Sequence, residues 1–409
     1  MSSISQALAD VTEAQAVGFD AFALNIQQPD ASWTRASLAL LFDAAAQTNF
    51  KLFFSMDMST IPSPSACLSL LAQYTSHPAY YHHLSRPFLT TFRGGATDPS
   101  AWAPLLSSLT PRPYFLPNLD DHPSVQHQTL YPSSLLPSLS YADGITAWET
   151  AWPFPHTNST TSQTPTDTLN LAAAHAAGKT YMAPLSPFQS KHSPAWGNWY
   201  RAGGLLLAQR MVDLLELQPD FVQVLTWNDG GEGHYLGNLW PEAGAEKRVV
   251  EGWEHKGWLG LVGAWVAALK RGGRGARGVV PGQGREWEGV FWYRALVKGV
   301  ECDVDAVGLG KPDGWEDAED GVNVVVLLAE GSEGTRVRVV SGGKVVKEFE
   351  GSVGMNMWQV GWGLGEQVVQ VLAADGRVIG EGKGKMAVTD RLDDLGGICN
   401  FNYQVVEIV

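Results

Sequence analysis

Short apolar runs alternate with longer helix-compatible segments through the first two-thirds of the chain. Segments such as "RASLALLFDAAAQTN" and "RAGGLLLAQRMVDLLEL" have helical spacing and are rich in good helix formers. The apolar runs resemble parallel strands that are covered on both faces. They comprise residues 20–26, 51–58, 86–92, 112–119, 143–149, 179–187 and 220–229. This alternation of strands and helices predicts an α/β sheet.

Seven such runs are one fewer than a (β/α)8 barrel requires. The chain opens with a helical pattern, "SISQALADVTEAQAVG", directly before the first run, and a last helical segment spans 256–272. We therefore expect a (β/α)8 barrel of the TIM type that lacks its first strand. The runs at 20–26 and 220–229 would then be edge strands with unpaired N–H and C=O groups.

The character of the sequence changes after residue 272. A Gly- and Arg-rich stretch at 273–285 is typical of a linker. From residue 286 to 409 the chain has short β-branched runs, such as "VNVVVLLAE" and "TRVRVVSG", separated by Gly, Asp and Ser. This pattern predicts an antiparallel β-sandwich. The expected organisation is thus a barrel domain at 1–272, a linker at 273–285 and a β-sandwich accessory domain at 286–409.

Composition and charge exclude several classes of protein. The formal net charge is −14, from 28 basic and 42 acidic residues, which argues against a nucleic-acid partner. No run of 18 apolar residues occurs, so we expect no membrane span. The N-terminal residues lack the basic-then-apolar pattern of a secretory signal.

The chain has three cysteines and no CxxC motif, so we expect no cysteine-based metal site. Cys302 and Cys399 both fall in the predicted β-domain. They could pair in an oxidising compartment, which would leave Cys67 free.

Acidic residues lie where the predicted strands end. In (β/α)8 enzymes the active site is built at the C-terminal ends of the strands. The polar or aromatic residues at or just after these ends are Asp57, Asn118, Asp120, Asp121, Trp148, Glu149, Asp229 and Glu232. Trp152, Trp196, Trp199, Trp227 and Tyr235 lie in the same loops. Carboxylates among aromatic rings are typical of glycoside hydrolysis, which needs one protonated acid and one carboxylate that acts as base or nucleophile.

Structural alternatives exist for each of these residues. "NDGG" at 228–231 is also a hairpin-turn signal, but no alternating strand follows it, so we favour a loop. Asp57 could instead cap a following helix. His234 could be a lone polar residue at the edge of the loop, because no metal-ligand partner stands at a fixed spacing from it.

Six stretches stand in order over about residues 10–270: "GFDAFALNI", "KLFFSMDM", "RPFLTTFRGG", "DGITAWETAWP", "YMAPLSPF" and "LELQPDFVQVLTWNDGGEGHYLG". Together they resemble glycoside hydrolase family 71, the fungal α-1,3-glucanases or mutanases. The most specific motif is W-N-D-x-G-E. The tail resembles the β-domain of the family, from "WYRA" through "GVNVVVLL" to "NFNY".

The resemblance implies a barrel with an appended β-sandwich and an endo-acting, inverting hydrolysis of α-1,3-glucan. The acids of W-N-D-x-G-E fall on Asp229 and Glu232, and the F-S-x-D-M acid of the family falls on Asp57. We assign Glu232 as general acid and Asp229 as general base, with the exchanged labels as the alternative. Asp57 would hold the water or tune the pKa of a neighbour. No cofactor and no metal is expected.

The substrate-binding residues that we predict stand beside these acids or at other strand ends. They are Trp227, Asn228, Trp148, Trp152, Tyr235, His234 and Asn25. The expected partner is α-1,3-glucan, and we expect a monomer. The family resemblance implies an extracellular or cell-wall location, whereas a chain without a signal peptide would be intracellular.

The chain departs from the family pattern at several positions. It has "RAGGL" (201–205) where the family commonly has R-G-D-D-L, Gly230 where an aromatic residue is usual, and Gly233 where a serine is typical. The first strand of the H-F-M-V-G type is not found. An alternative function is therefore a catalytically impaired, N-terminally truncated glucan-binding paralogue.

Overall fold

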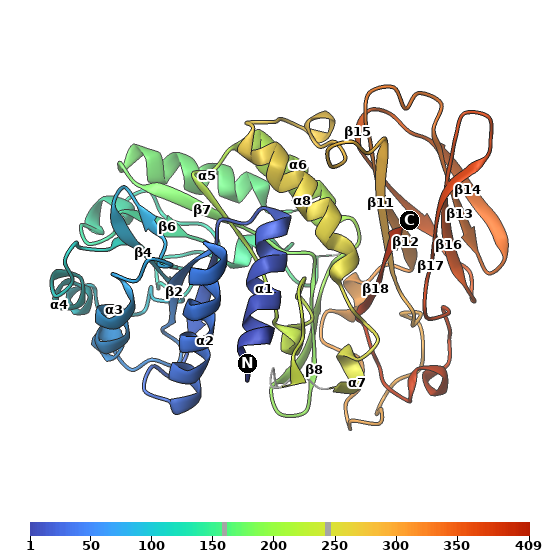
Figure 1. Cartoon of the computed structure of the whole chain (residues 1–409). Helices are drawn as coiled ribbons and strands as arrows, with labels where there is room; N and C mark the ends of the chain where they lie inside the picture. The colour runs from blue at the N-terminus through green and yellow to red at the C-terminus, as the bar shows by residue number, and fades with distance from the viewer. Residues whose placement is uncertain (158–161, 242–246) are drawn as a thin grey trace. The chain divides into compact units, whose positions relative to one another are not determined.

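The computed structural model describes residues 1–157, 162–241 and 247–409 (Figure 1). Contacts group the chain into two compact units. The first unit contains residues 1–151, 163–184 and 219–223, and the second contains 152–162, 185–218 and 224–409. Each unit is described by itself below.

The first unit is built on parallel strands that follow the chain order. One sheet has the path β1–β2–β4 with β5 paired to β4, and another has the path β10–β7–β6. A parallel bridge between Asn118 and Thr146 joins the ends of β5 and β6. The strands are β1 (Ala21–Ile26), β2 (Lys51–Asp57), β4 (Arg86–Phe92), β5 (Tyr114–Leu116), β6 (Gly144–Thr146), β7 (Thr180–Leu185) and β10 (Phe221–Val224). Every run predicted from the sequence therefore contains a strand, and the predicted α/β alternation is confirmed.

Two details of this sheet differ from the expectation. Several strands are shorter than their apolar runs, because residues such as 117–119 and 225–229 belong to the loops that follow. In addition, the two-residue strand β3 (His82–His83) pairs antiparallel with β4. Within the described residues, β1 and β10 are the end strands of their two sheets.

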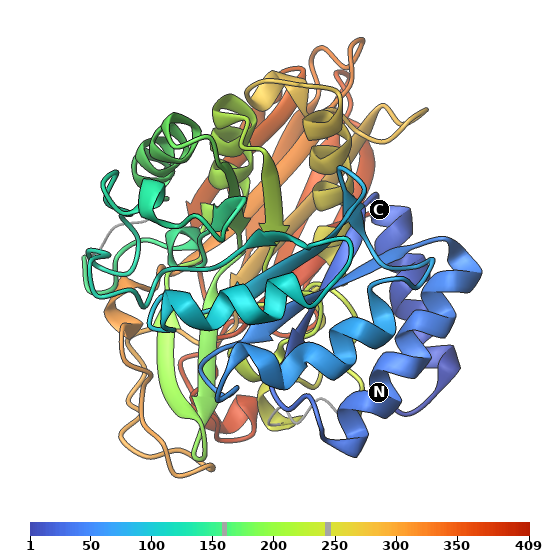
Figure 2. The ribbon, with the colours of Figure 1, turned by 90° about the vertical axis from the view of Figure 1, so that its left-hand side faces the viewer.

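Helices separate these strands. They are α1 (Ile4–Val17), α2 (Ser32–Thr48), α3 (Leu68–Tyr74), α4 (Trp102–Ser107) and α5 (Thr164–Ala176). Figure 2 shows the blue-to-cyan helices of this segment in front of strands of the same colours. The first helix begins where the side chain of Ser3 accepts the N–H of Gln6, and it ends at Gly18 in the left-handed conformation.

The second unit contains two antiparallel four-stranded sheets. The first has the order β15–β12–β11–β18 and the second has the order β14–β13–β16–β17. The strands are β11 (Trp287–Arg294), β12 (Gly321–Leu328), β13 (Arg336–Ser341), β14 (Lys344–Glu350), β15 (Gly354–Gly361), β16 (Gln367–Leu372), β17 (Val378–Lys383) and β18 (Tyr403–Ile408). The antiparallel, β-rich nature of the C-terminal third is thereby confirmed.

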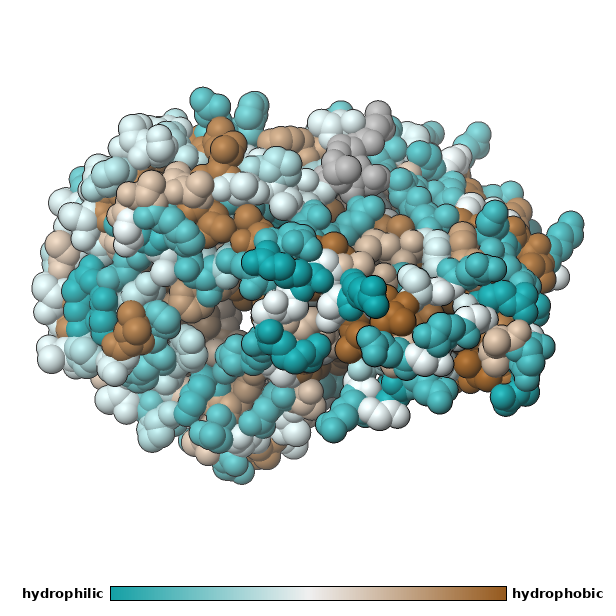
Figure 3. Space-filling view, turned by 90° about the horizontal axis from the view of Figure 1, so that it is seen from above, coloured by the Kyte–Doolittle hydropathy of each residue, from teal (hydrophilic) through white to brown (hydrophobic). Residues whose placement is uncertain are grey.

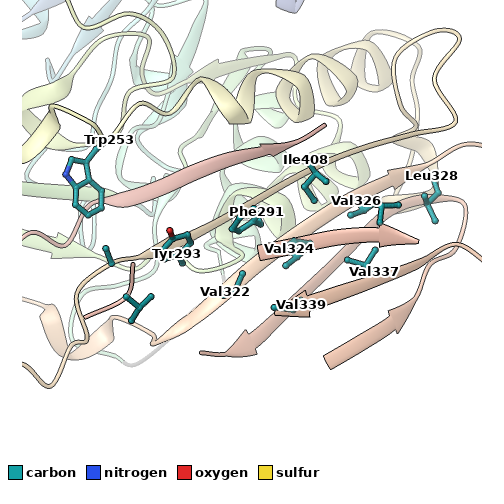
Figure 4. Packing of buried hydrophobic residues seen from close by; sticks show 14 residues of the cluster. Trp253, Phe291, Tyr293, Val322, Val324, Val326, Leu328, Val337, Val339 and Ile408 are labelled. Carbon is teal, nitrogen blue, oxygen red and sulfur yellow. The ribbon is translucent and has the colours of Figure 1, made fainter. Parts of the chain in front are cut away.

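One buried cluster takes side chains from both sheets (Figure 4). Val322, Val324 and Val326 of β12 alternate along the strand, as expected for residues on one face. Val337 and Val339 of β13 join the same cluster. Each buried Val side chain contributes about 1.5–3 kcal/mol relative to an exposed one, so this shared core stabilises both sheets.

Among the described residues, the rest of the second unit includes three α-helices and one hairpin. The helices are α6 (Leu206–Leu217), α7 (Lys247–Val250) and α8 (Leu259–Lys270), and the hairpin consists of β8 (Gln189–Ser193) and β9 (Gly197–Arg201). Figure 2 shows the hairpin as a yellow-green ribbon of two strands. The segment predicted as a linker contains the short 3-10 helix η8 (Ala276–Gly278), which packs against β15. The domain boundaries proposed from the sequence stay predictions.

The surface mixes polar and apolar residues. Figure 3 shows hydrophilic and hydrophobic residues interspersed over the face in view. Among the described residues, none of the helices combines the length and the apolar character that crossing a bilayer would need.

Candidate active site

Backbone hydrogen bonds join the two ends of the loop that follows β10. The strand ends at Val224, and the N–H of Thr226 donates to the carbonyl of His234 at 2.6 Å. The N–H of Gly237 donates to the carbonyl of Trp227 at 2.7 Å. Residues 225–241 contain a 3-10 helix, η5 (Gly230–Glu232), and no strand. The interpretation as a loop rather than a hairpin is therefore confirmed.

Asp229 and Glu232 stand at the two ends of this loop's short helix. Asp229 caps η5, because its Oδ1 accepts the backbone N–H of Glu232 at 3.1 Å. One oxygen of each carboxylate and one ring nitrogen of His234 all lie within 4.8 Å of one another. The Asp229 side chain is 42% exposed and the Glu232 side chain is 24% exposed. Both carboxylates thus remain accessible to solvent.

The pKa of Asp229 lies below its ordinary value. Burial raises this pKa, but the hydrogen bond and charge of His234, the N–H of Glu232 and the charge of Lys191 lower it by more. A group with a lowered pKa is ionised at neutral pH. This ionisation suits Asp229 to accept a proton from a water molecule.

Glu232 is held by the hairpin that follows β7. Its Oε1 accepts a hydrogen bond from Lys191 Nζ at 2.9 Å, and its Oε2 accepts one from Gln189 Nε2. The ammonium of Lys191 also lies over the ring of Trp199, 4.4 Å from the ring centroid. The loop can approach β8 this closely because residue 233 is a glycine. A Cβ on Gly233 would lie 2.8 Å from the carbonyl oxygen of Ser190.

His234 is completely buried and lies beside both carboxylates. Its Nε2 is 3.3 Å from Asp229 Oδ2 and 3.6 Å from Glu232 Oε2. The centroids of the His234 and Trp152 rings lie 5.7 Å apart. The guanidinium carbon of Arg201 lies over the Trp152 ring, 5.0 Å from its centroid. His234 is therefore a partner of both acids rather than a residue at the edge of the loop. The same three side chains offer oxygen and nitrogen atoms at a spacing that a metal ion could use.

Asp57 and Asn25 are brought together at the ends of two neighbouring strands of the first unit. Asn25 of β1 donates from Nδ2 to Asp57 Oδ2 at 3.4 Å, and Asp57 is 3% exposed. Asp57 Oδ1 accepts the N–H of Ser59 at 3.0 Å. The carboxylate therefore closes a local turn and caps no helix, because the next helical residues begin at Pro64 after a different cap residue, Ser63.

Asp120 is a buried carboxyl in the same unit that our sequence reasoning noted but did not select. Its Oδ2 accepts the N–H groups of Trp148 and Glu149, each at 3.0 Å, and its Oδ1 accepts the hydroxyl of Tyr131. Burial raises the pKa of Asp120 to about 7, the charge of Glu149 adds to this rise, and the hydrogen bond from Tyr131 opposes it. The ring of Trp148, which is half-buried, packs edge-on against Phe92 at 4.8 Å.

The predicted substrate-binding aromatics differ in exposure. Asn228 is exposed and Trp227 is half-buried. Trp152 is completely buried and Tyr235 is 1% exposed. Tyr235 stacks on His255 at 3.9 Å, and its hydroxyl donates to the carbonyl of Trp253. Burial favours a packing role for Trp152 and Tyr235, and their assignment to substrate binding stays a prediction.

Sequence reasoning missed Gln189 and Lys191. The stretch "QSKHS" places these two side chains on one face of a strand, because alternate residues of a strand point the same way. This alternation of side chains was the local signal that Gln189 and Lys191 point the same way. The contact with Glu232, 41 residues away in the chain for Lys191, has no local signature.

The three cysteines are free and buried. Cys302 and Cys399, the possible pair, are hydrogen-bond partners of each other, and burial is the main cause that raises the pKa of each thiol. Both sulfur atoms therefore belong to one small cluster in the second unit.

Glycoside hydrolysis requires a pair of carboxyl groups, and the loop after β10 carries such a pair among polar donors and aromatic rings. The model of glycosyl hydrolase family 71 matches residues 2–409. The chain is 34% identical over 387 residues to a mutanase of Penicillium rubens, which covers 93% of this chain and 81% of the relative. It is 30% identical over 413 residues to a glucan endo-1,3-alpha-glucosidase of Schizosaccharomyces pombe, covering 96% and 88%. The chain belongs to glycosyl hydrolase family 71.

Solved structures show a related fold. An endo-alpha-mannosidase of family GH99 from Bacteroides thetaiotaomicron superposes with a TM-score of 0.52 at 15% identity. The similarity covers 66% of this chain and 81% of that chain. At this identity the likeness concerns the fold alone.

Proposed function

We propose that this chain hydrolyses α-1,3-glucan, acting within the polymer and with inversion at the anomeric carbon. The proposal is carried by Asp229 and Glu232, whose oxygens approach within 4.8 Å on the loop after β10 in a member of family 71. The names of two relatives, a mutanase and a glucan endo-1,3-alpha-glucosidase, support the substrate. No observation on the described residues favours the catalytically impaired alternative.

We assign Glu232 as the general acid and Asp229 as the general base. The lowered pKa of Asp229, to which His234 and Lys191 contribute, supports the base role because a base must be ionised before reaction. Glu232 is the less exposed of the two carboxyls. In the proposed reaction it donates a proton to the leaving oxygen. Asp57, oriented by Asn25 and Ser59, is the third carboxylate that we propose to hold the water or tune a neighbour.

We propose Trp227, Asn228, Trp148 and Asn25 as substrate-binding residues, with His234 orienting both acids. Trp227 and Asn228 flank Asp229 directly and retain exposed surface, which supports contact with a sugar. Trp152 and Tyr235 are buried, so they would support substrate binding indirectly, by holding His234 and the backbone of the loop in place.

For the fold, we propose a (β/α) barrel of the seven parallel strands β1, β2, β4, β5, β6, β7 and β10, followed by a β-sandwich. The order of these strands along the chain supports the barrel. The core shared by two antiparallel sheets supports the sandwich. We also propose that the protein is a monomer that acts at a fungal cell wall, since a relative in Schizosaccharomyces pombe is named an ascus wall endo-1,3-alpha-glucanase.

The activity is tested by reducing-sugar release from insoluble α-1,3-glucan, with starch and β-1,3-glucan as substrate controls. We expect release from α-1,3-glucan alone. Glu232→Gln should lower kcat by roughly 10²–10⁴-fold, since general acid catalysis contributes about that much. Glu254→Gln removes a carboxylate that pairs with Lys385 at the surface and should leave the rate unchanged. Equal rates for Glu232→Gln and the unaltered chain would refute the assignment.

The stereochemical course is tested by NMR of the first product. Inversion of an α-linkage yields the β-anomer first. Inverting enzymes hold their carboxyl groups about 6.5–9.5 Å apart, and retaining enzymes hold them about 5–5.5 Å apart. The approach of Asp229 and Glu232 oxygens to within 4.8 Å lies nearer to the spacing of retaining enzymes, so the proposal of inversion rests on the family and not on this distance. We expect the β-anomer, and an initial α-anomer would overturn this part of the proposal.

A further inference from the structure

One face of the β8–β9 hairpin contacts the acid loop and also carries an aromatic ring. Gln189 and Lys191 of β8 both donate hydrogen bonds to Glu232. Directly opposite residues of an antiparallel pair lie on the same face. The residue opposite Lys191 is Trp199, and the Lys191 ammonium lies 4.4 Å from the centroid of the Trp199 ring. The aromatic ring therefore lies on the face that holds Glu232.

The Trp199 ring extends along this face toward the turn of the hairpin. Gly197 stands two residues before Trp199 in β9, so both positions belong to one face. A Cβ on Gly197 would lie 2.6 Å from Cζ3 of Trp199, and the φ of Gly197 is +114°, which favours glycine. The glycine thus leaves room for the indole ring between Lys191 and the turn.

The opposite face of the hairpin is fixed by a later segment of the same unit. His192 and Asn198 are opposite residues, and His192 Nδ1 lies 2.8 Å from Asn198 Oδ1. The buried Nε2 of His192 lies 2.6 Å from Asp305 Oδ2, and Asn198 Nδ2 donates to the carbonyl of Gly310 at 2.9 Å. A hairpin held in this way loses little freedom when a ligand binds to its other face.

Trp196 stands in the turn 194–196 at the end of this hairpin. It is 72% exposed, although tryptophan is usually well buried in folded proteins. At about 3.4 Å per residue, Ser193 at the end of β8 lies about 7 Å beyond Lys191 along the strand, and the turn lies further out. A ligand that reaches both Glu232 and Trp196 must therefore be a chain of several units rather than a single sugar.

The chemistry of the turn suits a polysaccharide. An indole ring offers a flat apolar surface with one N–H donor at its edge. A glucose ring has apolar C–H faces and hydroxyl groups at its rim, so it can stack on an indole and still donate and accept hydrogen bonds. Because the hairpin is continuous with the acid loop, the polymer cleaved at Glu232 is the ligand best placed to reach Trp196.

We propose that the β8–β9 hairpin is an outer binding platform for the α-1,3-glucan chain, in which one glucose unit stacks on Trp196. The proposal rests on the function proposed above and names a contact away from the bond that breaks. Trp196 therefore acts on the binding of long chains and not on the chemical step.

The first test measures binding to insoluble α-1,3-glucan by depletion of the protein from solution. Glu232→Gln serves as the parent chain, so that the polymer is not consumed. Adding Trp196→Ala should weaken binding about tenfold, whereas Trp196→Phe keeps an aromatic ring and should retain most of it. Leu84→Ala is a matched control, because Leu84 is 74% exposed in the turn 84–85 between β3 and β4. It should bind like the parent.

The second test separates a binding platform from a structural role. The ratio of kcat/KM on long α-1,3-glucan to kcat/KM on short α-1,3-linked oligosaccharides should fall about tenfold in Trp196→Ala. A residue needed only for folding would lower both values alike and leave the ratio unaltered. An unaltered ratio together with unaltered binding would overturn the proposal.

The outcomes also distinguish the failure of this proposal from the failure of the proposed function. If the unaltered chain hydrolyses no glucan, yet Trp196→Ala weakens its binding to α-1,3-glucan, the platform stands and the proposed reaction is refuted. If Trp196→Ala weakens binding to starch or β-1,3-glucan but not to α-1,3-glucan, the assignment of the ligand is wrong. If the parent chain does not bind α-1,3-glucan, the platform is refuted as well.

Discussion

His255 should make the stability of this protein fall in mild acid. The ring is completely buried, and its Nδ1 and Nε2 lie 2.9 Å from two acceptor oxygens, the carbonyl of Tyr235 and Asn402 Oδ1, respectively. Burial lowers the pKa of His255 from 6.5 to about 4, and these hydrogen bonds only partly oppose the effect. In the unfolded chain the same ring takes up a proton near its ordinary pKa.

The direction and size of the effect follow from this difference. As the pH falls below 6.5, the unfolded chain gains a proton that the folded chain does not accept until about pH 4. The free energy of unfolding therefore decreases through this window and levels off below it. At about 1.4 kcal/mol per pH unit, the full loss from His255 is on the order of 3 kcal/mol.

The effect is measured by urea unfolding, followed by tryptophan fluorescence, at a series of pH values across the window. His255→Gln keeps a side chain that can form hydrogen bonds but cannot titrate, so it should be less stable near neutral pH yet lose about 3 kcal/mol less on acidification. His127→Gln repeats the substitution at an exposed histidine outside this network and should follow the unaltered chain. Parallel curves for His255→Gln and the unaltered chain would refute the reasoning.

Three further predictions concern other parts of the molecule. Gly233→Ala should lower kcat strongly with little effect on expression, because φ is +72° and the new Cβ would lie 2.8 Å from a backbone oxygen of β8; unaltered kinetics would contradict this. Asp143 pairs with Arg86 at 2.7 Å; burial raises the pKa of Asp143, but Arg86, the N–H of Phe115 and the charge of Arg112 together lower it by more. Asp143→Asn should therefore cost about 1.5–3 kcal/mol at neutral pH, and the difference should begin to shrink below the ordinary pKa of aspartate and vanish below the lowered pKa of the folded state; a pH-independent difference would count against the ion pair. Oxidative refolding should join Cys302 to Cys399, detected as a linked peptide pair in mass spectra, whereas two alkylated thiols after oxidation would show that the contact does not convert to a disulfide.

The loop after β10 illustrates how much of the structure a local stretch of sequence predicts. An apolar run followed by Asn228, Asp229 and two glycines predicts a strand that ends in a loop, and the structure has that loop. The absence of a second alternating run excluded a hairpin. These are statements about backbone conformation over a few residues, which neighbouring side chains largely determine.

The environment of the acids could not be predicted in the same way. Gln189 and Lys191 reach Glu232 across 43 and 41 residues of chain, and Asn25 reaches Asp57 across 32. Tyr235 illustrates the reverse case. Its position next to the motif predicts a sugar contact, which stays a prediction, and no local pattern indicates that its ring is buried against His255, a partner 20 residues away.

The sequence by itself determined the alternation of strands and helices, the change to short β-runs in the C-terminal third, and the loop that carries Asp229 and Glu232. Periodicity and turn chemistry encode these features because each depends on residues within a few positions of one another. Only the tertiary structure decided which cation contacts Glu232, that Asp120 and His255 are buried, and which aromatic rings remain exposed. Burial, ion pairing and pKa depend on which distant segments pack against a side chain, and no local pattern records that packing.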